Sequence, residues 1–281
     1  MHFNLVHVVP GKMAHGLNGY KEVIDTIQWG LRELGHRADY SLNTISPTAT
    51  NIIFGFQVLT PELLESLPPE TIIFHAEQLR GFEVSQLKPQ ALIAARRFEI
   101  WDYSRANDDV WRRVGAGRLR HVPIGYAPVL QRIPKATDQD IDVLIYGSPG
   151  EDRLSAFHYL ARSGLTTVFV AGLYGSARDG LIARSKLIAN INLFTNSKIF
   201  EVVRVSYLLA NRKAVVADID SETFIDEDIR AGIAVSTSGD LVDRCLHLAS
   251  HDEERAALEE RGFAAIEKRD IRAILTQALK A

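Results

Sequence analysis

The sequence predicts an α/β protein made of two doubly wound, Rossmann-like domains, each with a parallel sheet. Short apolar runs alternate with segments of helical spacing along most of the 281 residues. Glycines and small polar residues follow several of these runs. The composition is that of a globular protein, with 46% hydrophobic and 24% charged residues. A polar stretch at residues 128–140, with Pro134 inside it, matches neither strand nor helix spacing and is interpreted as a linker.

These observations divide the chain into four parts. Residues 1–127 are expected to form the first domain and residues 141–264 the second, with the linker at 128–140 between them. Residues 265–281 are expected to form a terminal helix, whose apolar stripe has to be covered.

The first domain begins with an apolar run, a glycine-containing loop and a helix that ends at Gly35. Further short apolar runs follow, which are typical of buried parallel strands. The expected strands are residues 3–9, 51–58, 71–76 and 98–103; the expected helices are residues 20–34, residues 60–67 and a segment through Trp111.

Polar residues follow two of these strands and are candidates for chemistry. His75 and Glu77 would point to the same side if their strand continued that far, and either could act as a general base. The alternative is that they only end the strand. Ser104 and Asn107 follow the next strand, where they suit a helix N-terminus. Arginines are abundant in residues 96–120, which indicates either a solvated helix face or a basic patch for an anionic acceptor or a membrane surface.

The second domain opens with an expected strand at residues 141–146. Gly147 and Ser148 follow it, and Arg153 lies in the expected first turn of the next helix. A glycine–serine turn at this place lets the backbone approach a phosphate, and an arginine adds several hydrogen-bond donors. Gly147, Ser148 and Arg153 are therefore candidate phosphate ligands.

The most informative stretch of the second domain is residues 186–218. We expect a strand at 190–194, a helix at 197–209 and a strand at 214–218, which would form a parallel βαβ unit. Lys198, Glu201 and Arg204 recur every third residue and would line one helix face, either as solvated ion pairs or as part of a site. Other expected strands are 166–171 and 233–236, and residues from Gly239 onward are expected to be helical.

Two sequence patterns resemble the GT-B glycosyltransferases, in particular the compact "glycosyl transferases group 1" type. One is F-E-x-x-R-x-x-x-x-L-A at residues 200–210, followed by V-V-x-D. The other is IWDYSRAN through PIGYAP in residues 100–128, which resembles the end of a GT-B N-terminal domain. The resemblance implies a central cleft between the two domains, a donor half formed by the second domain, and a terminal helix that returns to the first.

The resemblance also implies roles for individual residues. The donor is a nucleotide-diphosphate sugar, which acts as a co-substrate, and no other cofactor is expected. The implied donor-binding residues are Gly147, Ser148, Arg153, Gly172, Tyr174, Asn196, Ser197, Lys198 and Glu201. The implied acceptor-side residues are His15, Asn18, Gly19, Ser104 and Asn107. The candidate catalytic residues are His15, His75, Glu77 and Glu201. The sequence departs from the family at Leu209, where many members carry a second glutamate for the ribose.

Metal and nucleic acid are not expected partners. Asp218 and Asp220 spell D-x-D but follow a strand deep in the second domain, and we noted no cysteine or histidine cluster at ligand spacing. A net charge of −3 gives no general attraction to nucleic acid. The N-terminus does not read as a signal peptide and Cys245 is the lone cysteine, so we expect a cytoplasmic protein, with residues 96–120 as a candidate contact to the inner face of a membrane.

The expected function is metal-independent transfer of a sugar to an acceptor hydroxyl. A nucleotide-sugar epimerase and a non-catalytic module that binds a sugar nucleotide or a partner remain alternatives. A periplasmic-type solute binder is disfavoured by the missing export signal.

Overall fold

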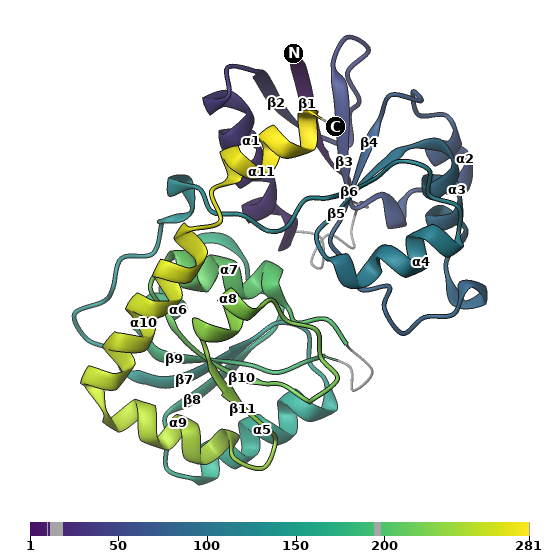
Figure 1. The fold of residues 1–281 in the computed structure, drawn as a ribbon. Coiled ribbons are helices and arrows are strands. Elements are labelled where there is room, and N and C mark those ends of the chain that lie inside the picture. The colour runs from purple at the N-terminus through teal and green to yellow at the C-terminus, as the bar shows by residue number, and fades with distance from the viewer. Residues whose placement is uncertain (10, 12–18, 194–197, 281) are drawn as a thin grey trace. The chain divides into compact units, whose positions relative to one another are not determined.

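The structure is a computed structural model that describes all residues except 10, 12–18, 194–197 and 281. The chain forms two compact units, each built around a parallel sheet with helices on both faces (Figure 1). The first unit contains Met1–Ala127 and Asp270–Ala281, and the second contains Pro128–Arg269. The predicted fold class, two Rossmann-like parallel-sheet domains, is confirmed.

The sheet of the first unit has the strand order β2-β1-β3-β4-β5-β6, and the neighbouring strands pair in parallel. The strands are β1 (His2–His7), β2 (Arg37–Leu42), β3 (Thr50–Phe54), β4 (Ile72–His75), β5 (Glu99–Asp102) and β6 (Leu119–His121). The central strands are buried on both faces, as expected for a parallel sheet covered by helices.

Helices cover both faces of this sheet. They are α1 (Lys21–Glu33), α2 (Pro61–Glu65), α3 (Pro89–Arg97), α4 (Asp108–Arg113) and α11 (Ile271–Lys280). The helices α2, α3 and α4 pack on one face through a core that includes Leu64, Ala94 and Trp111. Helices α1 and α11 lie together on the other face (Figure 1).

The C-terminal helix α11 returns to the first unit and packs closely on α1. The contact depends on Gly30: a Cβ atom there would lie 2.8 Å from Leu275 Cδ1 and 2.9 Å from Ile271 Cγ2. At the start of α11, the Ile271 backbone N–H donates to the Tyr126 carbonyl oxygen at 3.1 Å. The apolar stripe of α11 is therefore covered by α1.

The sheet of the second unit has the order β11-β10-β9-β7-β8, again with parallel pairing. Its strands are β7 (Ile141–Tyr146), β8 (Thr167–Val170), β9 (Ser185–Asn190), β10 (Ala214–Asp218) and β11 (Ala234–Ser236). Its helices are α5 (Glu151–Arg162), α6 (Gly175–Arg184), α7 (Val202–Ala210), α8 (Glu227–Ala231), α9 (Leu241–Ser250) and α10 (Asp252–Glu267). Helices α5, α9 and α10 share a buried apolar cluster with the sheet.

Two predicted elements around residue 190 are wrong in their bounds. The strand predicted at 190–194 is β9, which ends at Asn190, and the helix predicted from 197 is α7, which begins at Val202. The cause is a tertiary contact: Ile199 forms a parallel bridge with Phe224, and the Phe200 N–H donates to the Phe224 carbonyl at 3.0 Å. This pairing holds residues 198–200 extended, although their sequence continues the helical pattern.

The continuous helix predicted after Gly239 is also wrong, because the structure divides it into α9, α10 and α11. His251 separates α9 from α10 with φ −115° and ψ 84°, which is outside the helical region.

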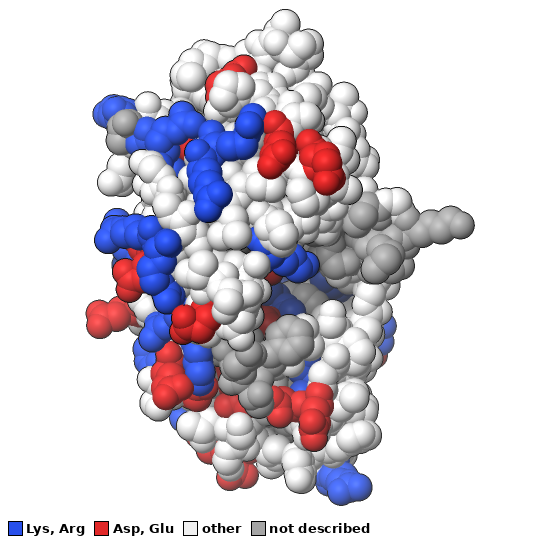
Figure 2. All heavy atoms as spheres, turned by 90° about the vertical axis from the view of Figure 1, so that its right-hand side faces the viewer, with Lys and Arg blue, Asp and Glu red and all other residues white. Residues whose placement is uncertain are grey.

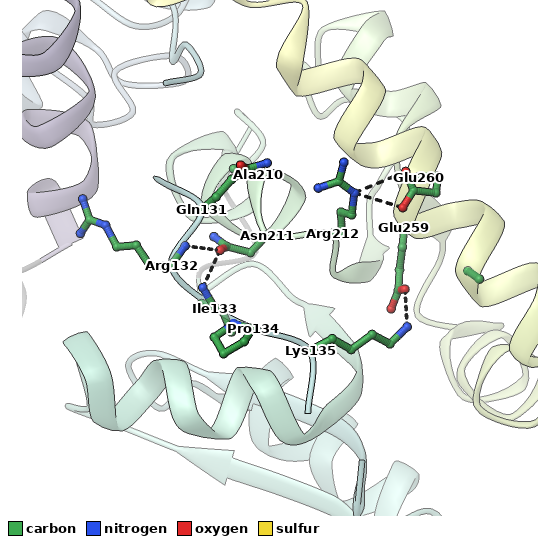
Figure 3. A pocket seen from close by; sticks show the side chains of 11 residues that line it. Gln131, Arg132, Ile133, Pro134, Lys135, Ala210, Asn211, Arg212, Glu259 and Glu260 are labelled. Carbon is green, nitrogen blue, oxygen red and sulfur yellow. Dashed lines mark hydrogen bonds and ion pairs between the residues drawn. The ribbon is translucent and has the colours of Figure 1, made fainter. Parts of the chain in front are cut away.

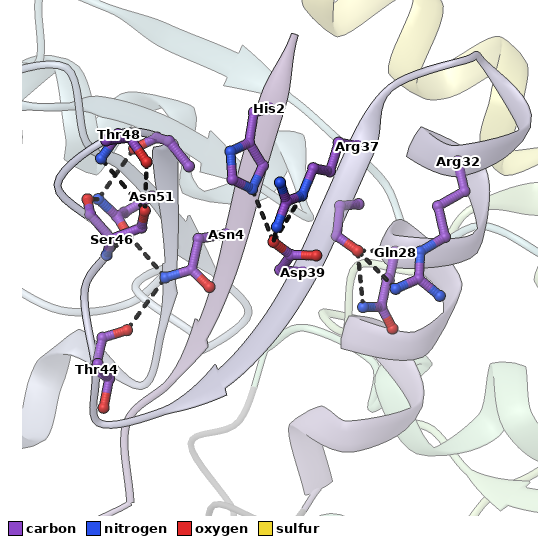
Figure 4. Close-up of polar contacts among 12 residues, drawn as sticks. His2, Asn4, Gln28, Arg32, Arg37, Asp39, Thr44, Ser46, Thr48 and Asn51 are labelled. Carbon is purple, nitrogen blue, oxygen red and sulfur yellow. Dashed lines mark hydrogen bonds and ion pairs between the residues drawn. The ribbon is translucent and has the colours of Figure 1, made fainter.

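Strand β2 was not predicted, because it is a polar edge strand with exposed side chains. A polar contact joins it to β1, since Asp39 accepts from His2 Nε2 at 2.8 Å; Asp39 also accepts from Arg37 Nε of its own strand at 3.1 Å (Figure 4). Within the same sheet, Asn4 Nδ2 of β1 donates to Asn51 Oδ1 of β3 at 2.9 Å.

In the part of the chain that the structure describes, no helix combines the length and apolar character that crossing a membrane requires.

Candidate functional site

The carboxyl ends of β7 and β9 lie side by side in the second unit, because these strands are parallel neighbours. Strand β7 ends at Tyr146 and leads into Gly147, while β9 ends at Asn190. In open α/β sheets this edge is where ligands bind. Side chains from α5 and from the start of α7 meet at this edge.

Arg153 of α5 is the buried centre of the site, with a relative exposure of 1%. Its Nε donates to the Ile191 carbonyl at 2.8 Å, its Nη1 to the Ser148 carbonyl at 3.0 Å, and its Nη2 to Glu201 Oε1 at 2.7 Å. Burial lowers the pKa of Arg153, and the Glu201 carboxylate opposes that shift. Arg153 therefore ties the two strand ends and the start of α7 together.

Glu201 precedes the first residue of α7 and joins the two arginines of the site. Its second oxygen, Oε2, lies 2.6 Å from Nη1 of Arg204. Arg204 also lies over the Tyr146 ring, at 5.2 Å from its centroid. Its side chain keeps 21% of its surface exposed, unlike that of Arg153. We call Arg153, Glu201 and Arg204 the strand-edge cluster.

Gly147 has no side chain, and the guanidinium groups of both arginines lie where a side chain would be. Its φ of +127° favours glycine, and a Cβ atom at this position would lie 2.9 Å from Arg153 Nη1 and 2.9 Å from Arg204 Nη2. Two arginines and one carboxylate leave the strand-edge cluster with an excess of positive charge. Among the described residues, the buried Asn190 Nδ2 beside it has no hydrogen-bond partner.

The structure brings Arg153 and Glu201 together, as expected from the sequence, with Arg153 Nη2 donating to Glu201 Oε1. Their predicted contact with a donor stays a prediction. The Nε and both Nη groups of Arg153 each donate to a protein oxygen. Arg204 is the more exposed cation. The sequence placed it with Lys198 and Glu201 on one helix face, either as solvated ion pairs or as part of a site, but no donor-binding role was predicted for it.

The remaining predicted donor-binding residues lie in several places. Lys198 does not join the strand-edge cluster: its Nζ pairs with Glu222 Oε2 at 2.8 Å and with Asp220 Oδ2 at 3.0 Å. Ser148 is exposed directly after Gly147. Gly172, with φ +68°, and Tyr174 lie between β8 and α6. The predicted residues Asn196 and Ser197 lie outside the described residues.

Leu209, which occupies the place of the family's second glutamate, faces the protein core. It is fully buried, and a Cβ atom on Gly262 of α10 would lie 2.8 Å from its Cδ2. Its position on α7 is therefore not available for a polar contact to a ligand.

Asp218 and Asp220, the two aspartates of the D-x-D sequence, contact different partners. Asp218 accepts from Ser238 Oγ at 2.8 Å, and burial raises the pKa of its carboxyl group. Asp220 accepts from Thr223 Oγ1 at 2.8 Å and pairs with Lys198.

In the first unit, His75 forms a buried pair with Asp102. The two residues are register partners at the ends of β4 and β5, and His75 Nδ1 lies 2.7 Å from Asp102 Oδ2. Asp102 also accepts from Trp111 Nε1 at 2.6 Å and from the Ser104 backbone N–H at 2.8 Å. This network fixes the imidazole with one nitrogen toward the carboxylate. Asp102 was not predicted as a site residue.

Asn107 and Ser104 have structural partners in this network. Asn107 is fully buried; its Oδ1 accepts from the Leu79 and Arg80 N–H groups at 2.8 and 3.1 Å, and its Nδ2 donates to Asp102 at 3.1 Å. Ser104 Oγ accepts from the Ala106 N–H at 3.3 Å. Asn107 therefore uses its amide to hold the loop after β4.

The strand does not continue to Glu77, because β4 ends at His75. The two residues therefore do not lie on one strand, and they contact different partners. Instead Glu77 Oε1 accepts from the Tyr20 hydroxyl at 2.6 Å, and burial together with this carboxylate raises the pKa of Tyr20 well above its usual value. Gly19 begins the turn that leads into α1. The predicted residues His15 and Asn18 lie outside the described residues.

The arginines of residues 96–120 are partly paired. Arg120 contacts Glu99 at 2.6 Å, and longer contacts join Arg112 to Asp108 and Arg113 to Glu83, at 3.8 and 3.7 Å. Figure 2 shows Lys and Arg side chains gathered on part of the first unit. Contact with a membrane stays a prediction.

A separate pocket of about 570 Å³ lies near the amino-terminal end of β10, the opposite edge of the sheet from the strand-edge cluster (Figure 3). Lys135 Nζ donates to Glu259 Oε2 across it at 2.7 Å, and Arg212 pairs with Glu260 at 3.1 Å. Asn211 closes one wall by accepting from the Arg132 and Ile133 N–H groups. These contacts pair four of the charged side chains that line the pocket: Lys135, Arg212, Glu259 and Glu260.

Comparison with known proteins identifies the architecture. No model of a protein family matches the sequence, and neither does the sequence of any curated protein. Solved structures do match along the whole chain. Anabaena HepE in complex with UDP-glucose has a TM-score of 0.62 at 13% identity, covering 100% of this chain and 99% of HepE.

Two further solved structures also match over nearly the whole length of both chains. WaaG, a glycosyltransferase of lipopolysaccharide biosynthesis, has a TM-score of 0.61 at 10% identity, covering 99% of this chain and 98% of WaaG. The T4 phage protein BGT, in complex with its UDP-glucose substrate, has a TM-score of 0.58 at 14% identity, covering 100% of this chain and 98% of BGT. Together with the two parallel-sheet units, these matches show that the chain has the GT-B fold of glycosyltransferases.

Proposed function

We propose that the protein transfers a glycosyl group from a nucleotide-diphosphate sugar to an acceptor hydroxyl. The observation that carries the proposal is the strand-edge cluster at the carboxyl ends of β7 and β9, next to Gly147 with its positive φ. The fold supports it, since HepE and T4 BGT, which share this architecture, bind UDP-glucose.

In this proposal the second unit binds the donor through its diphosphate. When the bond between the anomeric carbon and the diphosphate oxygen breaks, negative charge develops on the leaving diphosphate. Arg204, together with the Ser148 backbone N–H in the turn after Gly147, would stabilise that charge, as preorganised donors do in other enzymes. A guanidinium suits this task because its fork of donors matches phosphate oxygens.

Arg153 and Glu201 act in the proposal as positioning residues. Glu201 binds Arg153 at 2.7 Å and Arg204 at 2.6 Å, so it holds the exposed arginine against the buried one. Without Glu201, two guanidinium groups would face each other near Gly147 and repel. The arginines supply the positive charge in this scheme, and the proposal assigns no metal ion to the step.

The first unit supplies the candidate base for the acceptor. His75 is oriented by Asp102, which leaves its other ring nitrogen as the atom able to accept a proton from a hydroxyl. Glu77 is more exposed and is the second candidate for this role.

The proposal is tested by donor hydrolysis and donor binding with UDP-, GDP- and dTDP-sugars, each of which carries a diphosphate. We expect at least one of them to raise the melting temperature, because a ligand at a hundredfold its dissociation constant adds about 2.7 kcal/mol of stability. Arg204→Gln should weaken that binding by about tenfold or more, since hydrogen bonds to charged groups are worth about 1.5–3 kcal/mol.

Arg184→Gln is the matched control, because Arg184 is an arginine of the same unit whose partner, Asp140, is outside the strand-edge cluster. The control should bind and hydrolyse the donor like the wild type. Binding of a nucleotide sugar without hydrolysis or transfer would favour the non-catalytic module. If none of the three donors binds, or if Arg204→Gln binds like Arg184→Gln, the proposal fails.

A further inference from the structure

The junction between α9 and α10 gathers three side chains that can ligate a metal. They are His247 in the last turn of α9, His251 between the helices, and Glu254 in the first turn of α10. One ligand atom from each lies within 4.8 Å of the others. The expectation that the sequence holds no histidine cluster at ligand spacing is wrong here, since His247 and His251 are four residues apart on the end of one helix.

We propose that His247, His251 and Glu254 form a binding site for a divalent metal ion of the zinc class. All three side chains are exposed, so an ion can reach them from solvent without opening the fold. The site shares no residue with the strand-edge cluster and does not depend on the proposed function.

The orientation of His251 matches that of a metal ligand. Its Nδ1 lies 2.7 Å from the His247 carbonyl oxygen. A carbonyl only accepts, so Nδ1 carries the hydrogen and Nε2 keeps its lone pair. Histidines that bind metals typically donate their other ring nitrogen to a carbonyl or carboxylate in this way, which fixes the tautomer and the ring.

His247 and Glu254 already face each other. His247 Nε2 lies 2.8 Å from Glu254 Oε2, and a metal ion would take the place of the hydrogen that now bridges these two atoms. The His247 and His251 rings are nearly parallel, with centroids 4.0 Å apart and an interplanar angle of 22°. Because imidazole lone pairs lie in the ring plane, the rings have to rotate out of this stack before both can bind one ion; the exposure of both side chains leaves room for that rotation.

The donor set selects the class of ion. Two imidazole nitrogens and one carboxylate oxygen are ligands that zinc commonly takes, whereas calcium and magnesium prefer oxygen ligands alone. Three protein ligands leave a fourth position for water or an outside ligand. Because the ligands come from both sides of His251, where the helical backbone is interrupted, the ion would fasten α9 to α10.

The test is a calorimetric titration of the chain, free of any histidine tag and dialysed against a chelator, with zinc chloride. We expect one zinc ion to bind per chain and to raise the melting temperature. His247→Ala and Glu254→Gln should each weaken binding at least tenfold, since even a lost outer contact of a zinc ligand costs about 10–100-fold in affinity. Both positions are exposed, so the variants should fold, and their melting temperatures without zinc verify this.

Glu253→Gln is the matched control, an exposed glutamate adjacent to Glu254 but outside the cluster. It should keep the wild-type affinity. The same titration with magnesium chloride should show no binding at this site. The proposal is overturned if wild type shows no saturable binding of one zinc ion, or if His247→Ala and Glu254→Gln bind zinc as tightly as Glu253→Gln.

Discussion

Arg153 and Arg204 are chemically the same and lie in one cluster, yet burial gives them different roles. Arg153 is enclosed, and its nitrogens donate to two carbonyls and to Glu201. Arg204 shares Glu201 but keeps part of its guanidinium exposed. An anion that enters from solvent can therefore meet Arg204 more readily, while Arg153 maintains the geometry.

Another buried cation, Lys213, makes the stability of the fold depend on pH. Its side chain is 1% exposed, and burial lowers its pKa to about 8, although Glu259 opposes the shift. The pKa in the unfolded chain is about 10.4, so between these values the unfolded state binds more protons than the folded state. Stability linked to Lys213 therefore rises as the pH increases from about 8 to about 10.

Lys213→Met tests this account. The variant should lose the Lys213-linked part of the rise between about pH 8 and pH 10, which amounts to about 3 kcal/mol at most. Chemical denaturation of the variant and of wild type at several pH values measures it. A variant that retains the full pH dependence of wild type would show that Lys213 is not its source.

Part of the site could be predicted from residues alone. Arg153 and Glu201 both follow strands that end at one sheet edge, and this was enough to expect them near each other. Asp102 was missed because its pairing with His75 depends on the register of two strands far apart in the sequence. Asn107, in contrast, was predicted as a site residue and its amide suits a ligand contact, but in the folded chain this amide holds a loop.

At the scale of elements, tertiary pairing decides where α7 begins. Residues 198–200 continue the apolar helical pattern, but pairing with Phe224 keeps them extended. This shift places Glu201 before the helix rather than within it, where its carboxylate reaches both arginines. No local pattern of residues could have shown this, because the partner strand segment lies more than twenty residues away.

The contact between α1 and α11 yields a prediction at this scale. Gly30→Ala places a methyl group 2.8 Å from Leu275 Cδ1 and 2.9 Å from Ile271 Cγ2, so these side chains must move or α11 must shift. We expect a loss of about 1–3 kcal/mol in the free energy of unfolding, as for other overpacked sites. Chemical denaturation measures the loss.

Gly180→Ala is the matched control for this prediction. Gly180 lies in α6, is exposed, and a Cβ atom there would have no neighbour within 4 Å among the described residues. This substitution should stabilise the protein by about 0.5–1 kcal/mol, because alanine loses less backbone freedom in a helix. If Gly30→Ala were as harmless as Gly180→Ala, the close packing of α11 on α1 would be refuted.

At the scale of the whole molecule, the fold class was the easiest property to predict. The alternation of buried runs with helical segments requires parallel sheets with helices on both faces, whatever the individual residues are. The strands β7 and β10 have the bounds expected from the sequence. The edge strand β2 was missed because its polar residues lack the apolar signal of a central strand.

The central claim is that the strand-edge cluster binds the diphosphate of a nucleotide sugar. The most direct measurement is a crystal structure of the chain with bound UDP. The account predicts diphosphate oxygens within hydrogen-bond distance of the Arg204 guanidinium and of the Ser148 backbone N–H. A UDP molecule bound elsewhere, with Arg204 still facing solvent, would contradict it.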